Sequence, residues 1–370
     1  MQSKTLSLFF SKGMSLKQWD DLGMLEREIL LYKELSNHFG RIYFFTYGDN
    51  NEMKYQKYLP DNIRICPKVN KLPLKLYSIL LPFFYIKEIR RSDILKTNQM
   101  SGSWAAVLAS WISGAKLVVR CGYEWLEVME RRKYSFWKLK LATFLESLAY
   151  KSADIIVFSN EADKEFARKR FGLSADTLVI IPNFVNSELF KPIPVTKEKN
   201  RIIFVGKLEE QKNIFQLIEA ISILQVRLII IGNGSLRGAL ERFVKEKNAP
   251  VEFWGNISNS QLPEELNKSE LFILPSLYEG HPKVLLEAMS CGLPCIGTNV
   301  KGIGTIIEHE KNGYLCETKV EAIRSAIEKV LNDSKLQARI GKGARDTVLS
   351  NFGFQKIVQM ELNVYNDFIQ

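Results

Sequence analysis

The chain has 370 residues, of which 46% are hydrophobic and 25% are charged, as in an ordinary folded protein. This length is sufficient for two domains with full cores. The longest apolar run, residues 76–86, contains a proline and is too short to span a bilayer, and the N-terminal segment lacks the apolar core of a secretory signal. We therefore expect a cytoplasmic protein. Five scattered cysteines and three histidines favour neither a disulfide framework nor a tetrahedral metal site.

Positive charge is concentrated in the first half of the chain. Residues 1–190 hold 28 basic and 20 acidic side chains, so this half carries +8 of the net charge of +10. Within it, residues 54–91 and 125–148 mix basic and aromatic residues around apolar positions at helical spacing. Two interpretations remain open: basic amphipathic helices that bind an anionic membrane surface, and core-facing helices with a solvated basic edge. Nucleic acid is not an expected partner, since no known nucleic-acid-binding signature is present.

Short β-branched and aromatic runs alternate with helical patterns along the chain, which predicts an α/β protein with two Rossmann-like units of parallel strands. In the first half we expect strands at residues 6–10, 41–47, 63–66, 93–96, 116–120, 154–158 and 178–181. In the second half we expect them at residues 201–205, 227–231, 251–254, 271–274, 294–297 and 313–316. The polar, proline-bearing segment 186–200 marks the join, so the expected domains are residues 1–189 and 190–352, followed by a helix at 353–370.

The most informative segment is residues 279–294, EGHPKVLLEAMSCGLP. Pro282 suits the first position of a helix, which therefore opens near His281, and Gly292 with Pro294 ends it after about ten residues. The apolar run before it predicts the order strand, loop, helix. Ligands bind at the carboxyl ends of parallel strands, and the free N–H groups and positive dipole end of a helix start favour a diphosphate there.

Two carboxylates accompany this helix. Glu279 precedes it, and the side chain of Glu287 leans back toward its N-terminus, so both can reach one ligand and accept hydrogen bonds from sugar hydroxyls. The alternative is a loop acid and a solvated helix acid with no common role.

The whole string, Glu-Gly-x-Pro-x4-Glu-Ala-Met-x2-Gly-x-Pro, resembles the E-x7-E motif of the retaining family-4 glycosyltransferases. Residues 201–221 and 296–315 are similar to other parts of the C-terminal domain of that family. The resemblance implies a GT-B fold, in which two Rossmann-like domains face a central cleft, and a last helix that crosses back onto the first domain. The first domain then binds the acceptor and the second binds the donor.

The activity that the resemblance implies is transfer of a hexosyl group from a UDP- or GDP-sugar to a hydroxyl of a glycan or a lipid-linked saccharide. The transfer occurs with retention and without a metal or a cofactor, as in the synthesis of surface polysaccharides. The motif identifies neither the sugar nor the acceptor.

Three residues after the strand at 201–205 favour phosphate binding. Gly206 allows close approach of the backbone, and Lys207 and Lys212 can neutralise a diphosphate, although a basic surface turn is the alternative. By resemblance these lysines take the place of a basic pair that is usually Arg then Lys. Lys207 keeps the charge of the arginine but loses its bidentate fork.

The resemblance also assigns the remaining donor contacts. Glu279 acts in catalysis together with the two lysines, and Glu287 binds the ribose. The donor sugar and diphosphate are expected to meet Gly280, His281, Lys283 and Val284. The base is read by backbone groups near Asn256 and Ile257, so uridine and guanosine cannot be distinguished; the Asn256 side chain is equally explained as a turn former.

The first domain departs from the family. Its opening loop offers Gly23 for approach to a phosphate, with a helix-entry glycine as the alternative, and lacks the usual double glycine. Many relatives place a histidine after the strand at 116–120, where this chain has Arg120, a substitute candidate for contacting the donor. Gln99 is a similar candidate on the acceptor side.

Three other classes of protein compete with this interpretation. A sugar-nucleotide epimerase or hydrolase would use the same scaffold without an acceptor, and a non-catalytic glycan-binding protein would keep only the fold. A nicotinamide oxidoreductase is disfavoured because Gly232 and Gly234 begin a G-x-G-x-x-G motif that Arg237 breaks.

Overall fold

The computed structural model describes residues 3–122, 126, 129–130 and 133–368. The chain forms two compact units, one of Met1–Pro182 with Val358–Gln370 and the other of Asn183–Ile357. The boundaries expected from the sequence, at 189–190 and 352–353, lie a few residues away from these. We refer to the two as unit 1 and unit 2.

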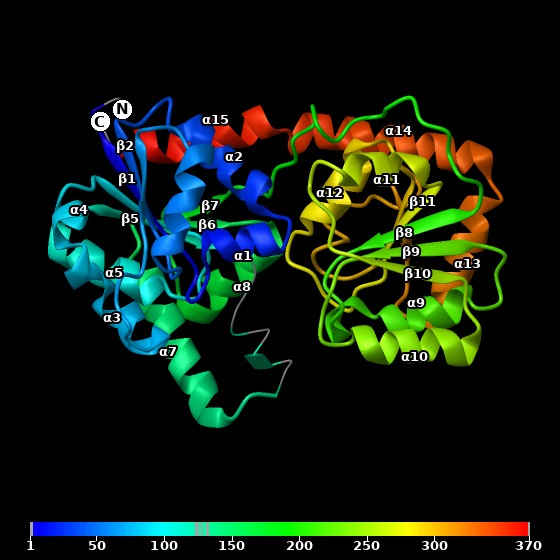
Figure 1. The fold of residues 1–370 in the computed structure, drawn as a ribbon, viewed down its shortest axis with the longest axis horizontal. Helices are drawn as coiled ribbons and strands as arrows, with labels where there is room; N and C mark the ends of the chain where they lie inside the picture. The colour runs from blue at the N-terminus through cyan, green and yellow to red at the C-terminus, as the bar shows by residue number, and fades with distance from the viewer. Residues whose placement is uncertain (1–2, 123–125, 127–128, 131–132, 369–370) are drawn as a thin grey trace. The chain divides into compact units, whose positions relative to one another are not determined.

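Unit 1 is built on a parallel sheet of seven strands in the order β3-β2-β1-β4-β5-β6-β7 (Figure 1). Its strands are nearly continuous apolar runs because helices cover both faces of the sheet. The strands are β1 (Thr5–Phe9), β2 (Arg41–Phe45), β3 (Ile63–Cys66), β4 (Ile94–Thr97), β5 (Lys116–Cys121), β6 (Ile155–Phe158) and β7 (Leu178–Ile180).

The helices of unit 1 divide between the faces of the sheet as right-handed crossovers require. One face carries α3, α5, α7 and α8, and the other carries α2 and α15 (Figure 1). The helices are α1 (Leu16–Asp21), α2 (Leu25–Leu35), η1 (Asn50–Tyr58), α3 (Leu74–Phe84), α4 (Ile86–Arg90), α5 (Ser103–Ser113), α7 (Phe136–Ser152), α8 (Glu161–Phe171), η2 (Ala175–Thr177) and α15 (Phe354–Asn366).

Unit 2 has a parallel sheet of six strands in the order β10-β9-β8-β11-β12-β13. The chain winds from β8 to one edge and returns through β11 to the other, so the topological switch point lies between β8 and β11, where ligands bind in such sheets. The strands are β8 (Arg201–Val205), β9 (Arg227–Ile231), β10 (Val251–Gly255), β11 (Leu271–Leu274), β12 (Cys295–Thr298) and β13 (Tyr314–Cys316).

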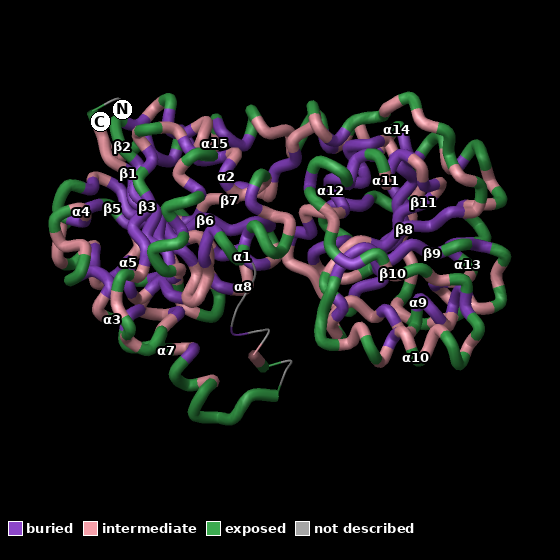
Figure 2. Tube along the Cα trace, in the orientation of Figure 1, coloured by how far each residue is buried: buried purple, intermediate pink, exposed green. Residues whose placement is uncertain are grey.

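The helices of unit 2 enclose one hydrophobic core with this sheet. In the tube view the central strands are buried, and exposed positions lie on the outer faces of the helices (Figure 2). The edge strand β10 also has exposed residues, at Glu252 and Trp254. The helices are η3 (Glu210–Lys212), α9 (Ile214–Ile221), α10 (Arg237–Lys247), α11 (Leu262–Lys268), α12 (Lys283–Ser290), α13 (Val320–Leu331) and α14 (Ser334–Asn351).

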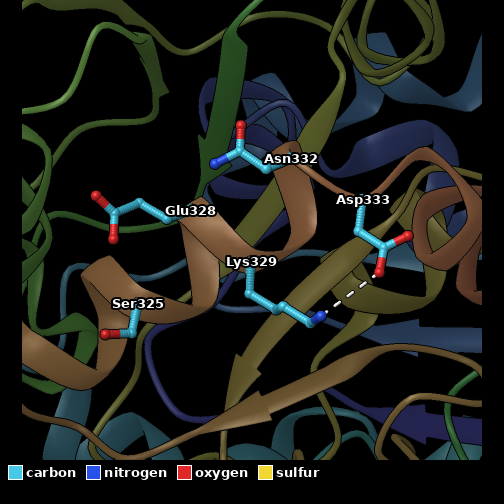
Figure 3. A pocket seen from close by; sticks show the side chains of 5 residues that line it. All are labelled: Ser325, Glu328, Lys329, Asn332 and Asp333. Atoms are coloured by element: carbon cyan, nitrogen blue, oxygen red, sulfur yellow. Dashed lines mark ion pairs between the residues drawn. The ribbon is translucent and has the colours of Figure 1, made fainter.

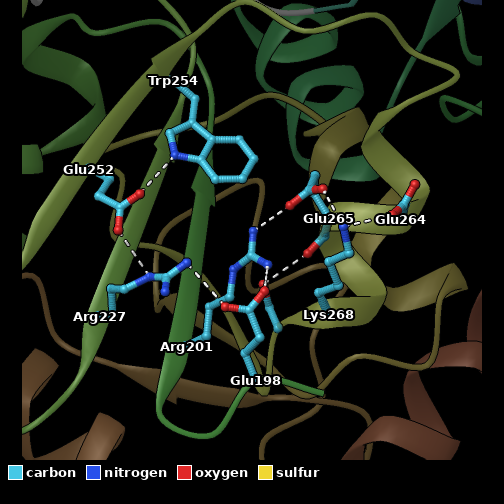
Figure 4. Close-up of polar contacts among 9 residues, drawn as sticks. Glu198, Arg201, Arg227, Glu252, Trp254, Glu264, Glu265 and Lys268 are labelled. Atoms are coloured by element: carbon cyan, nitrogen blue, oxygen red, sulfur yellow. Dashed lines mark hydrogen bonds and ion pairs between the residues drawn. The ribbon is translucent and has the colours of Figure 1, made fainter. Parts of the chain in front are cut away.

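A charged network secures the amino ends of β8 and β9, away from the switch point (Figure 4). The Arg201 side chain is 1% exposed and bonds Glu198 at 2.5 Å and also Glu265. Arg227 bonds Glu198 and Glu252, each at 3.1 Å. The two carboxylates that bind the buried Arg201 guanidinium reduce the cost of removing its charge from water, so this network has a structural role.

The expected fold is confirmed. All thirteen expected strands are present, with ends that shift by at most two residues. Cys291 and Cys295 are buried thiols, as expected, and burial raises the pKa of Cys291 to about 12, which makes it unreactive near neutral pH. Within the described part of the chain, no helix is long and apolar enough to cross a membrane.

Candidate functional site

Helix α12 begins one residue later than the sequence predicts. Pro282 has φ −71° and ψ 109°, so this extended residue is the N-cap and not the first helical residue. It makes no side-chain capping bond, and the N–H groups of the first turn therefore have no cap from this residue. The end is as expected: Gly292 has φ +68°, its N–H donates to Met289, and Leu293 N–H donates to Ala288. This C-terminal motif gives a short helix with two well-defined ends.

The C-terminal end of α12 is also held by residues that the sequence did not identify. The Arg345 guanidinium on α14 donates to the carbonyl of Ser290, and the Ser290 hydroxyl donates to the carbonyl of Phe190 at 2.5 Å. A cation at the last carbonyl groups complements the helix dipole. No local signal could reveal Arg345, which lies 55 residues beyond Ser290 in the sequence.

The loops that follow β8 and β11 meet at the switch point through Lys212 and Glu279. Lys212 Nζ lies 2.5 Å from Glu279 Oε1, and the two side chains are 15% and 8% exposed. The Ser276 hydroxyl donates to the same oxygen at 2.6 Å. Both contacts fall on Oε1 among the described residues, so Oε2 can accept hydrogen bonds from a ligand. Sequence reasoning placed both charged residues near one ligand but missed their ion pair and the role of Ser276.

Two further hydrogen bonds, both to backbone carbonyl groups, join the same two loops. Gln211 Nε2 donates to the Tyr278 carbonyl at 2.8 Å, and Leu277 N–H donates to the Gln211 carbonyl at 2.8 Å. These bonds fix the ammonium group of Lys212 and the carboxylate of Glu279 on one rigid edge of the sheet.

Glu287 is buried in α12, with 2% of its surface exposed. The alternative of a solvated helix acid is therefore wrong, because a carboxylate withdrawn from water needs hydrogen-bonding or charged partners. Glu279 is likewise paired rather than a free loop acid. The structure thus places the two acids in settings that suit polar ligands.

The loop after β12 packs tightly over the start of the motif. A Cβ on Gly302 would lie 2.2 Å from the Gly280 carbonyl oxygen and 2.4 Å from the Glu279 carbonyl oxygen. Only glycine allows this approach without displacing the backbone. Residues 296–315, which contain Gly302, are similar in sequence to part of the family, but the sequence did not predict this contact.

Gly206 and Lys207 follow β8 directly, and Lys212 returns to lie over them. A Cβ on Gly206 would be 3.6 Å from Lys212 Cε, so the Lys212 side chain lies beside the phosphate-loop backbone. Lys207 is exposed. The basic-turn alternative therefore stays open for Lys207, whereas the mostly buried Lys212 is not an ordinary surface lysine.

His281 has a packing role in the structure. Its ring is buried and lies 5.2 Å from the ring of Phe352, and its carbonyl accepts a 2.6 Å hydrogen bond from Asn183 Nδ2. Lys283, the first residue of α12, places its ammonium 5.6 Å from the centre of the Phe184 ring, and Val284 follows it in the first turn.

The loops after β9 and β10 complete this edge. Gly232 N–H donates to the Gly255 carbonyl at 2.7 Å, and a Cβ on Gly232 would lie 2.0 Å from the Gly206 carbonyl oxygen. The close packing of these loops therefore explains why position 232, the first glycine of the incomplete G-x-G-x-x-G motif, is a glycine. Asn256, which is exposed, and Ile257 follow Gly255 at the end of the edge strand β10.

The hollow shown in Figure 3 has a volume of about 460 Å³ and belongs to a different part of unit 2. It is lined by Ser325, Glu328, Lys329, Asn332 and Asp333, all on α13 and its C-terminal end. None of the proposed donor residues borders it.

Two family models match the chain. "Glycosyl transferases group 1" matches residues 185–347, and "Glycosyltransferase Family 4" matches residues 29–189. The chain belongs to the family-4 glycosyltransferases. The expectation of a glycosyltransferase is thereby confirmed.

Relatives of this glycosyltransferase cover most of its length. It is 27% identical over 343 residues to UDP-Gal:alpha-D-GlcNAc-diphosphoundecaprenol alpha-1,3-galactosyltransferase from Escherichia coli, covering 84% of this chain and 86% of the relative. Sucrose-phosphate synthase from Thermosynechococcus elongatus superimposes with a TM-score of 0.81 at 20% identity over 99% of both chains. Anabaena HepE, solved with UDP and glucose, gives 0.80 at 18% identity over 98% and 99% of the two chains. Both structures show the GT-B fold.

In unit 1 of the glycosyltransferase, Gly23 ends helix α1. It has φ +68° and its N–H donates to Asp20 at 2.8 Å, while Met24 N–H donates to Trp19 at 2.7 Å. These are the bonds of a glycine-capped helix end. The start of α1 is also occupied, because the Glu52 carboxylate accepts hydrogen bonds from two backbone N–H groups there. The contact of Gly23 with a phosphate therefore gains no support.

Arg120 is part of a buried cluster around α15. Its guanidinium donates to the Ile181 carbonyl at 3.3 Å and lies 3.6 Å from Glu361 Oε1. Lys96 Nζ bonds Glu361 Oε2 at 2.5 Å, and the Tyr365 hydroxyl donates to the same oxygen at 2.6 Å. This geometry gives Arg120 a structural role, and its expected donor contact is not supported. Gln99 similarly accepts the Gly122 N–H at 2.9 Å.

Opposing effects act on the charges of this cluster. Burial disfavours the ionised Glu361, but the nearby charges of Lys96 and Arg120 outweigh burial and hold the pKa of Glu361 below its ordinary value. Burial lowers the pKa of Lys96, against the attraction of Glu361. The sequence offered no sign of this cluster, since Lys96 and Glu361 lie 265 residues apart.

Proposed function

We propose that this glycosyltransferase binds a nucleoside diphosphate sugar at the carboxyl edge of the unit 2 sheet and transfers its hexosyl group with retention, without a metal or a cofactor. The observation that carries the proposal is the ion pair between Lys212 and Glu279, fixed at 2.5 Å at the switch point beside the start of α12. A cation, a sugar-binding carboxylate and the positive end of a short helix then surround one position.

The diphosphate is assigned to Lys207, Lys212 and the first turn of α12 at Lys283 and Val284, with Gly206 allowing the backbone to approach. Negative charge grows on the diphosphate as its bond to the sugar breaks. Fixed positive groups therefore stabilise the transition state more than the bound donor, which is the requirement for catalysis.

Glu279 has two successive tasks in this scheme. Without donor it neutralises Lys212 and holds the ammonium group in place. With donor bound, its Oε2 accepts hydrogen bonds from hydroxyl groups of the hexose, and the backbone of Gly280 and His281 also contacts the hexose. Lys212 then lies between Glu279 and the departing diphosphate and attracts both. The bond from the anomeric carbon to phosphate breaks, the bond to the acceptor oxygen forms on the same face, and the acceptor proton passes to the leaving diphosphate.

Glu287 is assigned to the ribose hydroxyls, and the backbone near Asn256 and Ile257 to the base. Glu287 is already withdrawn from bulk water, where a charge-assisted hydrogen bond to a hydroxyl is stronger than at an exposed site.

The donor is proposed to be a UDP-hexose, and the acceptor a polyprenyl diphosphate-linked saccharide. The support is the Escherichia coli relative, whose name specifies UDP-Gal and a diphosphoundecaprenol-linked acceptor and which aligns with 84% of this chain. An acceptor of this kind implies that the enzyme works at the cytoplasmic face of a membrane, with no nucleic-acid partner.

The test is a panel of UDP- and GDP-hexoses with the purified protein, with and without lipid-linked saccharides. We expect UDP release that needs both a UDP-hexose and the acceptor, that survives EDTA, and that gives a product with the anomeric configuration of the donor by NMR. Equal nucleotide release without acceptor would favour the hydrolase alternative. Failure of every nucleotide sugar to bind would contradict the proposal.

A further inference from the structure

Unit 1 leaves large apolar side chains exposed on three helices of one face of its sheet. Seven of them are at least half exposed: Phe136 (61%) at the start of α7, and a further six, namely Ile79 (50%) and Phe83 (57%) on α3, Trp111 (61%) on α5, and Trp137 (76%), Leu141 (58%) and Phe144 (61%) on α7. We refer to these six residues as the apolar surface. Single exposed apolar residues are common, but a group on adjacent helices marks an interaction site.

The members of the apolar surface lie in stripes along their helices. Ile79 and Phe83 are four residues apart, and Trp137, Leu141 and Phe144 follow the spacing of one helix face. Helix α5 packs against both α3 and α7, and Trp104 Nε1 on α5 donates to Ser78 Oγ on α3 at 3.2 Å. The stripes therefore lie on neighbouring helices of unit 1, and the first half of α7 extends beyond the other two helices (Figure 1).

Packing of the fold does not use these side chains. Helix α7 buries Ala142, Glu146, Ala149 and Tyr150, three of them in its second half, whereas its first turn is exposed (Figure 2). The interpretation of a core-facing helix with a solvated basic edge fits the second half of α7, whereas the edge exposed in its first half is apolar as well as basic. Residues 125, 127–128 and 131–132 of the segment lie outside the described part.

The charges around the apolar surface are all positive in its two main segments. Residues 71–87 and 133–145 contain no aspartate or glutamate and six lysines: Lys71, Lys75, Lys87, Lys133, Lys138 and Lys140. The Lys140 ammonium lies 4.6 Å from the centre of the Phe136 ring, and the Lys138 ammonium lies 5.4 Å from that of Tyr134. Such lysines can extend their charge to a phosphate layer while their stems cover aromatic surface.

We propose that the apolar surface docks on an anionic lipid bilayer. Tryptophan and phenylalanine side chains enter the boundary between headgroups and acyl chains, and the neighbouring lysines contact lipid phosphates, as in interfacial helices. The positive charge favours an anionic bilayer over a second copy of the chain, because two such surfaces in contact would place lysines next to lysines. The proposal goes beyond the donor chemistry of unit 2 and does not rest on it.

The test is cosedimentation of the full chain with vesicles of phosphatidylglycerol and phosphatidylethanolamine, compared with phosphatidylcholine vesicles, without donor or acceptor. We expect binding to the anionic vesicles that weakens with salt. The double variant Trp137→Ser/Phe144→Ser should bind at least tenfold more weakly, and Lys138→Gln/Lys140→Gln should lose the preference for anionic lipid.

Matched controls come from exposed residues of unit 2. Ile223, which is 69% exposed, is replaced in Ile223→Ser, and the exposed lysines of α14 are replaced in Lys335→Gln/Lys342→Gln. Both controls should bind vesicles as the unmodified protein does, and circular dichroism should show that all variants are folded.

Three outcomes would overturn the proposal: no binding of the unmodified protein to anionic vesicles, undiminished binding by Trp137→Ser/Phe144→Ser, or loss of self-association in that variant as measured by ultracentrifugation. Vesicle binding and nucleotide release are separate measurements. Failure of this proposal can therefore be told apart from failure of the proposed function.

Discussion

The two units each contain a lysine–glutamate pair of the same length in very different surroundings. In unit 1, Lys96 Nζ lies 2.5 Å from Glu361 Oε2, and both side chains are 1% exposed. In unit 2, Lys212 Nζ lies 2.5 Å from Glu279 Oε1, with exposures of 15% and 8% and a position at the switch point of the sheet. The equal N–O distances therefore do not show what each pair does. The two pairs differ in how deeply they are buried and in their place in the fold.

The difference follows from desolvation. A fully buried pair is held by the surrounding fold, and removal of one partner leaves an uncompensated charge that costs about 3–5 kcal/mol. A pair at a ligand-binding edge can exchange one partner for a ligand, because water and solutes still reach it. The first pair is expected to act on stability and the second on activity.

The largest expected effect is on the stability of unit 1. Glu361→Ala should lower the free energy of unfolding by about 3–5 kcal/mol, because Lys96 and Arg120 would lose their buried counter-ion. Chemical denaturation followed by circular dichroism measures this change. The control is Asp21→Asn, which removes the exposed pair with Lys17 and should change stability by less than about 1 kcal/mol.

A second substitution sharpens this result. Lys96→Met/Glu361→Leu should recover part of the lost stability, since the apolar pair needs no counter-ion while Arg120 still lacks one. If Glu361→Ala unfolds no more easily than Asp21→Asn, the buried pair has no such role.

The next effect is on activity. Lys212→Met should reduce kcat/KM by about a hundredfold, corresponding to about 2.7 kcal/mol of transition-state stabilisation by a fixed positive group, with stability nearly unchanged. Steady-state nucleotide release measures the rate, and thermal unfolding measures stability. Lys207→Met is the matched comparison, with a smaller loss expected because Lys207 is exposed. Equal activity of Lys212→Met and the unmodified enzyme would remove Lys212 from the mechanism.

The paired acids should give a smaller loss. Glu279→Gln and Glu287→Gln should each lower transfer about tenfold, because an amide keeps the shape but loses charge-assisted hydrogen bonds to hydroxyl groups. Isothermal titration with the nucleoside diphosphate alone distinguishes them: Glu287→Gln should weaken its binding, whereas Glu279→Gln should mainly weaken binding of the whole donor. Near-normal turnover in both variants would contradict the site.

Local sequence signals predicted those parts of the fold whose cause is local. The strands follow from apolar runs that end at turn residues, and the end of α12 follows from Gly292 and Pro294. The position of Glu279 and Lys212 follows from a general rule, that the carboxyl ends of neighbouring parallel strands meet at one edge.

The rest depended on contacts between distant residues. Asn183, Ser276 and Arg345 bind backbone or carboxylate groups of the site, but isolated polar residues of these types occur throughout the sequence. Arg120 was expected to contact the donor because it stands near the place where many relatives have a histidine, whereas in the structure it pairs with Glu361, which lies far along the chain. Pairing at such separations has no local pattern.

The last and smallest effect is the dependence of stability on pH. Since the pKa of Glu361 is lower in the folded protein than its ordinary value, the unfolded chain binds more protons, and the contribution of Glu361 is complete above the ordinary value of about 4.3. It should fall as the pH drops from there through the pKa of the folded state. Denaturation curves between about pH 3 and pH 7 should therefore show the stability gap between the unmodified protein and Glu361→Gln narrowing toward the acid end. A gap that stays constant or widens below pH 4 would mean that Glu361 is not held in its charged form by Lys96 and Arg120, and the contrast between the two lysine–glutamate pairs would lose its basis.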